Sequence, residues 1–159
     1  MGLRAFAVVV GMLVAVVATV MGVLLAGLRW QVGPALDLIR RMNRSVTNPR
    51  VMRTAGTPET PTSVIEHIGR KSGRTYETPI DIIDSPTGLL VALPYGTGAD
   101  WLRNVQAAGR ATVVRRGRRI DVVRPTIVAT ADVADLVPKR TMRMLRVFGV
   151  GQFLHLETS

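Results

Sequence analysis

The sequence contains no cysteine, which excludes disulfide bonds, thiolate catalysis and metal sites held by cysteine. Histidine occurs only twice, as His67 and His155, and no carboxylates accompany them at the spacing of metal ligands. Neither a Gly-x-Ser-x-Gly elbow nor a complete Gly-x4-Gly-Lys-Ser/Thr loop is present. The chain therefore has little polar machinery of its own, which is typical of proteins whose bound cofactor performs the chemistry.

Lysine is scarce as well: Lys71 and Lys139 are the only two, yet the formal net charge is +10. The positive charge is therefore carried by arginine, whose planar guanidinium binds phosphates and carboxylates at two points. This bias favours anionic ligands or lipid headgroups, although an arginine-rich codon usage gives the same composition. Nucleic acid is disfavoured as a partner, because aromatic residues make up 4% of the chain and no recognition-helix, zinc or RNA-binding sheet motif occurs.

A long apolar run occupies the amino-terminal end of the chain. Residues Ala5 to Leu28 carry no charge, and Arg4 and Arg29 flank them. A helix of that length measures about 36 Å, more than the roughly 30 Å hydrocarbon core of a bilayer. The run is also longer than the apolar part of a signal peptide. We therefore predict a transmembrane anchor over residues 1–30, with cleavage after it as the alternative.

The arginines that follow this run predict a single-pass protein of the cell membrane whose C-terminal domain faces the cytoplasm. Within the run, small residues recur at four-residue spacing, which lets two helices approach closely and predicts a homodimer; valine- and alanine-rich helices also produce this spacing by chance. They form two sets, Gly11 and Ala15, and Ala18, Gly22 and Ala26.

Residues 31–57 are predicted to form a juxtamembrane helix and a connector. The helix covers Pro34 to Asn48, with apolar residues on one side, and Pro49 is expected to end it. Next to a membrane, such a helix would rest on anionic membrane lipid. Packing against the following domain is an equally good prediction.

From residue 58 to residue 159 the apolar residues mostly alternate, which predicts a mainly β domain. Turns rich in glycine or proline separate five predicted strands: Ser63–Ile68, Tyr76–Ile83, Leu89–Leu93, Ala111–Arg115 and Arg119–Val128. Two helices are predicted, over Ala99–Ala108 and Ala131–Arg146, and the tail Val147–Leu156 is apolar enough to return to the core. These helices are too few to cross over a parallel sheet, so we predict a small antiparallel β-barrel with flanking helices.

The most distinctive stretch is Gly69-Arg70-Lys71-Ser72-Gly73-Arg74, between the first two predicted strands. It brings three cationic side chains, a hydroxyl and flexible backbone amides together within six residues. This composition suits a phosphate or a carboxylate better than a core, and the alternative is a solvated hairpin tip. We call residues 69–74 the basic turn and predict that it binds the anionic tail of a cofactor.

A second loop, residues 94–104, joins a predicted strand to a helix. Its glycines let a ligand approach the backbone, and the N-terminus of the helix offers free amides to an anion. Thr97 is expected to cap the helix. Trp101 either stacks on a flat ring system or packs beneath the barrel, and Asn104 either fixes the loop or binds the ligand.

In order, the chain presents Gly-Arg-Lys-Ser-Gly-Arg-x-Tyr-x-Thr-Pro, a strand, Tyr-Gly-x4-Trp-x-x-Asn, a helix, a glycine, a strand and Arg-Gly-Arg. This arrangement resembles the deazaflavin-dependent nitroreductase family, whose members fold as a split β-barrel and use coenzyme F-420. The resemblance runs from Asn43-Arg44 and Asn48-Pro49 through Pro125. It implies an FMN-binding-like split β-barrel that transfers a hydride from reduced F-420 to a quinone-like or nitro acceptor, with FMN as the second choice of cofactor.

The resemblance also implies roles for individual residues, all of them in cofactor binding and none in catalysis. The phosphate and oligoglutamate tail would be held by Arg70, Lys71, Ser72, Gly73 and Arg74. The deazaflavin ring would lie between Thr78 and Pro79 on one side and Pro94, Tyr95 and Gly96 on the other, supported by Trp101 and Asn104.

Two features depart from the family pattern. Members that reduce nitroimidazoles have a tyrosine in a C-terminal segment, where this chain has Phe148, Phe153 and His155; nitroreduction is therefore less expected. The apolar N-terminal run is an addition, which suits a lipid-soluble acceptor such as menaquinone. The competing prediction is a non-catalytic barrel that binds a flavin, haem or lipid.

Overall fold

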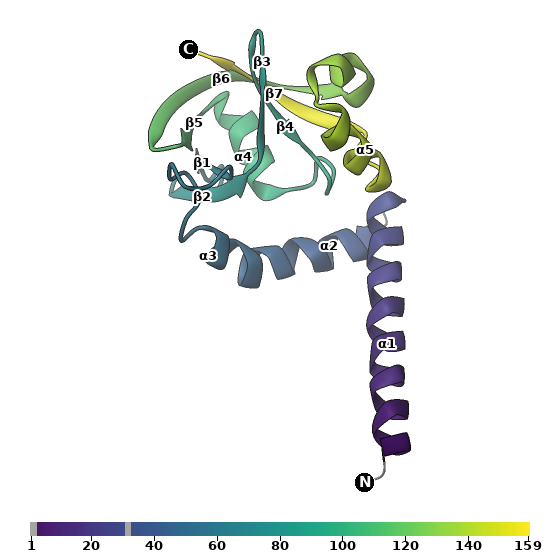
Figure 1. Ribbon diagram of the computed structural model, residues 1–159. Helices are drawn as coiled ribbons and strands as arrows, with labels where there is room; N and C mark the ends of the chain where they lie inside the picture. Colours follow the sequence, from purple (N-terminus) through teal and green to yellow (C-terminus); the bar gives the residue numbers. More distant parts are fainter. Residues whose placement is uncertain (1–2, 31–32) are drawn as a thin grey trace.

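The computed structural model describes residues 3–30 and 33–159. The first residues of the expected anchor and of the juxtamembrane segment, 1–2 and 31–32, lie outside this range. Helix α1 (Leu3–Arg29) leads away from the sheet domain, and α2 (Gly33–Met42) turns to run alongside that domain (Figure 1).

The predicted transmembrane anchor is wrong. Within the described ranges, no helix combines the length and the apolar character that a membrane span requires. Leucine, alanine and methionine favour a helix in the apolar run, but helix formation alone does not need a bilayer. The predicted cell-membrane location with a cytoplasmic domain fails with the anchor, and lipid binding by the next helix loses the argument on which it depended. The homodimer stays a prediction.

Pro49 does not end the juxtamembrane helix, contrary to the sequence prediction. Helix α2 continues as a π-helical stretch, Asn43–Thr47, and then as α3, Asn48–Val51, with the proline in the first turn of α3. Proline has no N–H to donate, so it is tolerated where a new helical segment starts. The widened π-helical turn immediately before it gives the backbone that new start.

Seven strands form one antiparallel sheet in the order β2-β1-β5-β6-β7-β4-β3. Their bounds are β1 Ser63–Ile68, β2 Thr75–Ile80, β3 Ile82–Ser85, β4 Gly88–Ala92, β5 Arg110–Arg115, β6 Arg118–Ala129 and β7 Gln152–Thr158. The two edge strands, β2 and β3, follow each other in the chain with only Asp81 between them. The sheet must therefore curl until its edges meet, which makes it a partly open barrel and confirms the mainly β fold with flanking helices.

Two predicted elements are divided in the structure. The strand predicted over Tyr76–Ile83 breaks at Asp81, where the chain changes from one edge of the sheet to the other. The helix predicted over Ala131–Arg146 is a 3-10 helix, Thr130–Leu136, followed by α5, Lys139–Val147. Pro138 separates these two helices because it cannot donate to the preceding turn. Helix α4 (Asp100–Ala108) lies close to its predicted bounds and ends at Gly109 in a left-handed conformation.

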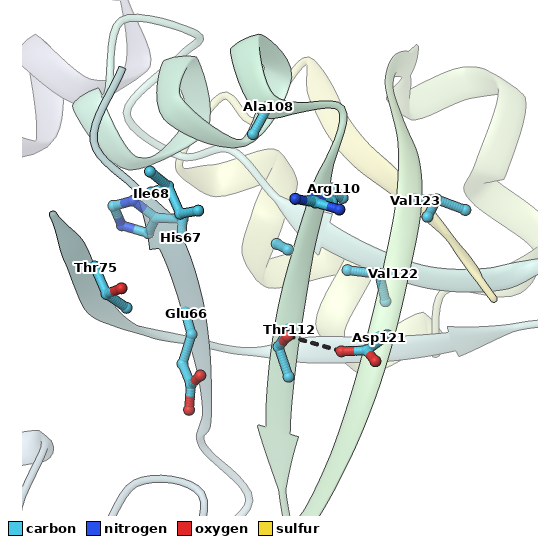
Figure 2. Close-up of a pocket in the computed structure, with 11 residues that line it drawn as sticks. Glu66, His67, Ile68, Thr75, Ala108, Arg110, Thr112, Asp121, Val122 and Val123 are labelled. Atoms are coloured by element: carbon cyan, nitrogen blue, oxygen red, sulfur yellow. Dashed lines mark hydrogen bonds between the residues drawn. The ribbon is translucent and has the colours of Figure 1, made fainter. Parts of the chain in front are cut away.

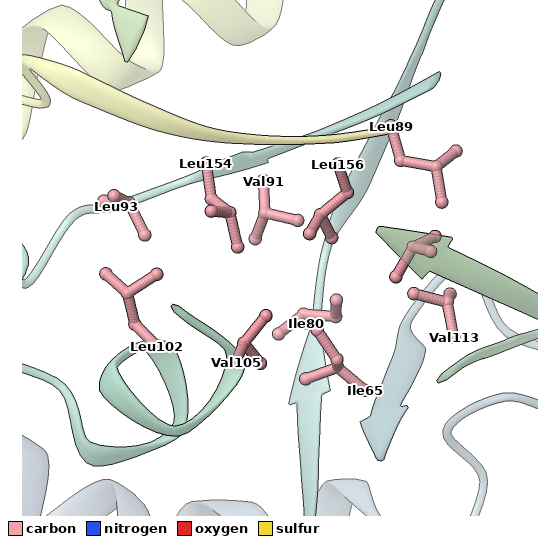
Figure 3. Packing of buried hydrophobic residues seen from close by; sticks show 11 residues of the cluster. Ile65, Ile80, Leu89, Val91, Leu93, Leu102, Val105, Val113, Leu154 and Leu156 are labelled. Atoms are coloured by element: carbon pink, nitrogen blue, oxygen red, sulfur yellow. The ribbon is translucent and has the colours of Figure 1, made fainter. Parts of the chain in front are cut away.

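Two hydrophobic cores lie on opposite sides of the sheet. The barrel core contains residues from β1, β4, β5, β7 and α4 (Figure 3), among them Ile65, Val91, Leu102 and Leu154. The second core, centred on Phe153, joins the outer face of β4 and β7 to α5. Leu154 and Phe153 are neighbours on β7, so their side chains point to opposite faces and this strand serves both cores.

Gly88, at the start of β4, is expected to tolerate no side chain. Its φ is +146°, and a Cβ atom there would lie 2.0 Å from the carbonyl oxygen of Leu156 on the paired strand. We expect Gly88→Ala to lower the free energy of unfolding by at least about 1–3 kcal/mol, because backbone strain and a clash with backbone are combined. Urea denaturation measures the change. Gly151→Ala is the control, since nothing lies within 4 Å of its Cβ position; equal losses in both variants would contradict the prediction.

Candidate functional site

The basic turn is a compact loop between β1 and β2. The amide of Gly69 donates to the carbonyl of Arg74 at 2.8 Å, and the amide of Gly73 donates to the carbonyl of Gly69 at 2.8 Å. Gly73 adopts a left-handed φ of +67°, which glycine accepts without steric cost. The Ser72 hydroxyl lies 3.1 Å from the Tyr76 hydroxyl. Backbone bonds thus define the turn and leave its cationic side chains available for other contacts.

Arg70 joins the basic turn to the N-terminal part of α4. Its guanidinium forms an ion pair with Asp100 at 3.1 Å and donates to Oδ1 of Asn104 at 2.8 Å. Its backbone amide donates to the same oxygen at 3.2 Å. The two loops that the sequence singled out therefore lie side by side in the structure. The role of their residues in cofactor binding stays a prediction.

Lys71 and Arg74 differ from Arg70 in their surroundings. Both side chains are exposed, and among residues 3–30 and 33–159 neither takes part in an ion pair. Arg70 is already engaged by a carboxylate and an amide oxygen of α4. The turn thus contains one cation with an internal structural role and two cations whose charge is available to a ligand.

A chain of polar contacts runs from Arg70 into the domain. Asn104 and His67 are both buried, and Nδ2 of Asn104 lies 3.2 Å from Nδ1 of His67. On the other side of the ring, Nε2 lies 3.2 Å from the hydroxyl of half-buried Thr78. The Tyr76 ring stacks on the imidazole, with ring centroids 5.9 Å apart. Burial lowers the pKa of His67 below its ordinary value, so the ring is neutral at neutral pH.

Thr78 and Pro79 lie on β2, opposite Ile65 and Val64 of β1 in the antiparallel register. Successive residues of a strand face opposite sides of the sheet, and opposed residues share a side. Thr78 therefore shares the inward side of the sheet with Ile65, whereas Pro79 faces outward. The two residues that were expected to line one ring surface thus lie on different faces of β2.

The loop before α4 is held from outside the sheet domain. Arg40 of α2 donates from its guanidinium to the carbonyl of Tyr95 and to Asp37. The same guanidinium lies close to Gly98, where a Cβ atom would lie 2.8 Å from Arg40 Nη2, so Arg40 would have to shift to admit a side chain there. This contact explains the second glycine of the loop by close packing, and it fixes the path of Tyr95 and its neighbours.

One expectation for this loop is wrong, and two open alternatives are decided. Thr97 does not cap α4: the residue at the cap position is Ala99, and it provides no side-chain hydrogen bond. Asp100 follows in the first turn, where its charge favours the helix dipole. Trp101 is partly buried and packs against the barrel core, which agrees with its packing interpretation. Asn104 lies inside the domain and fixes the basic turn.

A groove of about 470 Å³ opens beside the basic turn, where β1 and β5 diverge (Figure 2). Its lining includes Glu66 and Thr75 near the turn and Arg110 and Asp121 on the neighbouring strands. The hydroxyl of Thr112 donates to Asp121 at 2.8 Å across β5 and β6. None of the residues predicted from the sequence to bind cofactor lines this groove, but His67, which contacts Asn104 and Thr78, does.

Sequence reasoning missed three residues that organise the site. His67 was seen only as a histidine within a strand; its spacing from Ile65 on an alternating strand is the signal that it faces inward. The pairing of Asp100 with Arg70 joins segments 30 residues apart, and no local pattern predicts it. Arg40 is likewise far in sequence from Tyr95, whose carbonyl it holds.

Comparison with known proteins gives distant structural similarities only. No family model matches the chain, and no curated protein matches it. Among solved structures, the haem storage protein HutZ from Vibrio cholerae has a TM-score of 0.48 and 13% identity over 70% of this chain and 89% of that one. A reductase dependent on F-420-H2 has a TM-score of 0.46 and 14% identity over 61% of this chain and 94% of its own. At these scores and identities the similarities do not decide what this chain binds.

Proposed function

We propose that the protein is an oxidoreductase that uses the deazaflavin coenzyme F-420 and transfers a hydride to a quinone-like or nitro acceptor. The observation that carries the proposal is the junction of two distant loops. Arg70 of the basic turn is bonded to Asp100 and Asn104 of the second loop, while Lys71 and Arg74 remain exposed. Both loops belong to the motif through which the sequence resembles the deazaflavin-dependent nitroreductases.

The donors of the basic turn fit a ligand with several negative charges. Two exposed cations and the Ser72 hydroxyl lie within four consecutive residues, on a loop whose backbone is fixed by its own hydrogen bonds. Charge-assisted hydrogen bonds of this kind are about twice as strong as neutral ones. Lys71 and Arg74 would hold the phosphate and carboxylates of the tail, and Arg70 would keep the turn beside α4.

The remaining residues of the proposed site would orient the cofactor and enclose its ring system. When bound, the cofactor supplies the hydride. The Thr78 hydroxyl, held by His67, would contact one side of the ring system, and the loop at Tyr95, held by Arg40, would enclose it. Such positioning can supply much of the rate of a hydride transfer, so no general base from the protein is required.

A non-catalytic binder of a flavin, haem or lipid is the second candidate. The absence from the sequence of cysteine and of an obvious acid–base pair suits binding as well as cofactor-driven catalysis. The paired loops favour catalysis, because an anion-binding surface would require the basic turn alone. The quinone-like or nitro acceptor and the homodimer are likewise proposed.

The decisive experiment uses the purified full-length chain with F-420, FMN and FAD in separate titrations, followed by fluorescence. We expect binding of F-420 in preference to both flavins, and reoxidation of reduced F-420 when a soluble quinone is added. Binding without reoxidation would favour the second candidate. A preference for FMN, or no binding of F-420, would contradict the proposal.

A further inference from the structure

His67 occupies the centre of the polar chain that connects the basic turn to Thr78. The chain of contacts contains four residues, each from a different part of the fold: Arg70 in the turn, Asn104 on α4, His67 on β1 and Thr78 on β2. The donor and acceptor of each hydrogen bond in this chain can be assigned, because Arg70, at one end, offers Asn104 only donors. The protonation state of the ring can therefore be read from the contacts.

The orientation of the Asn104 amide is set by Arg70. Both the backbone amide and the guanidinium of Arg70 are donors, and both point at the same side-chain oxygen of Asn104. The NH2 group of the amide must then face Nδ1 of His67, 3.2 Å away. An amide NH2 only donates, so Nδ1 must be an unprotonated acceptor.

The single proton of the neutral ring therefore lies on Nε2. From there it is donated to the hydroxyl oxygen of Thr78 at 3.2 Å. The hydroxyl accepts this bond and keeps its own proton free to donate elsewhere. Half-buried Thr78 thus presents a hydrogen-bond donor on the inward side of β2.

We propose that neutral His67 is a positioning residue that couples the basic turn to Thr78, and that protonation of its ring uncouples them. The coupling rests on the proposed function only in that both ends would contact the cofactor. A proton on Nδ1 would face the NH2 group of Asn104, donor against donor. Rotating the amide would relieve this contact but would turn the same NH2 group toward the two donors of Arg70. Without rotation the bond between Asn104 and His67 is lost, and with rotation the two bonds from Arg70 to Asn104 are lost.

None of the charged and titratable groups around the His67 ring forms an ion pair with it within the described chain, so protonation of the ring itself controls the coupling. Tyr76 of β2 stacks on the ring, and Arg70 and Asp100 reach it only through Asn104. The adjoining groove contributes Glu66 of β1, Arg110 of β5 and Asp121 of β6. Within the described chain no carboxylate pairs with the ring, and burial lowers its pKa below 6.5. The neutral ring is therefore favoured in the folded protein. The protein loses folding stability as the pH falls from about 6.5 toward the lowered pKa of His67, because the unfolded chain takes up the proton first.

The first test needs no cofactor. Nitrogen-15 NMR of the His67 ring in the full-length chain should show the Nε2–H tautomer at neutral pH. In an acid titration, the Arg70 amide signal should move with the same midpoint as the ring. The proposal would be overturned by a ring protonated on Nδ1 at neutral pH, or by an Arg70 amide signal that does not change as the ring titrates.

The second test measures F-420 affinity between pH 5.5 and 8. Carboxylates of the tail stay ionised in this range, since their ordinary pKa lies near 4. Below the pKa of the ring, affinity should fall by up to about tenfold per pH unit. His67→Asn keeps an acceptor near the Nδ1 position but cannot titrate, so its profile should be flat. His155→Asn is the matched control and should keep the wild-type profile.

The outcomes separate the two proposals. If the chain does not bind F-420 at any pH, the proposed function fails, and the cofactor-free NMR test still decides the coupling. If F-420 binds with an affinity that does not change across the midpoint that NMR gives for the ring, the function stands and the positioning role of His67 fails. A wild-type profile in His67→Asn would also overturn that role.

Discussion

Replacing Lys71 or Arg74 with alanine is expected to weaken F-420 binding by about 1–3 kcal/mol for each variant, or about 5- to 150-fold. Each side chain would lose a charge-assisted hydrogen bond to the anionic tail. Neither residue pairs with a described carboxylate, and both are exposed. The fold should therefore survive both substitutions, and fluorescence titration of F-420 measures the affinity directly.

The chain provides matched controls for both substitutions on α5. Lys139 is the second of the two lysines, and Arg143 is an exposed arginine of the same helix. Lys139→Ala and Arg143→Ala remove the same charges from a surface outside the proposed site. If they weaken binding as much as the variants of the basic turn do, overall charge and not the turn attracts the ligand.

Phe153→Ala is expected to give the largest loss of stability, about 3–5 kcal/mol of the free energy of unfolding. The Phe153 side chain is fully buried in the second core, between the sheet and α5. Its removal takes away apolar burial and leaves a cavity that the strand pairing of β7 with β4 and β6 prevents from collapsing. In thermal unfolding, a loss of this size corresponds to a decrease of roughly 6–20 °C in Tm.

Val147→Ala serves as the control for this prediction. Its side chain is 62% exposed at the end of α5, so the change should stay within about 0.5 kcal/mol. Because the second core lies away from the basic turn, folded Phe153→Ala should also keep its ligand affinity. A Tm equal to that of wild type would show that α5 contributes little to the stability of the sheet.

Local patterns predicted most of the strands because alternation and turn residues act over a few positions. The first strand begins and ends at Ser63 and Ile68 as predicted, and Gly109 ends α4 as expected. The errors occur where long-range structure decides. Asp81 divides a continuous β pattern because the barrel closes there, and the apolar N-terminal run forms a helix without meeting the requirements of a membrane span.

The candidate site was recognised in the sequence as two separate loops. What each loop contains is local information: three cations in the basic turn, and glycines followed by Asp100 in the second loop. The sequence did not predict which of the three cations of the basic turn forms an ion pair within the protein. The ion pair of Arg70 with Asp100 depends on the approach of α4 to β1, and several tertiary contacts set that approach.

The sequence by itself determined a mainly β domain with flanking helices and a basic turn rich in hydrogen-bond donors, since these follow from side-chain periodicity and composition. Only the tertiary structure decided that the turn lies against α4, that His67 is buried and neutral, and that Lys71 and Arg74 stay exposed. The reason is physical: burial, pairing and the direction of a hydrogen bond depend on neighbours that the folded chain brings from distant positions.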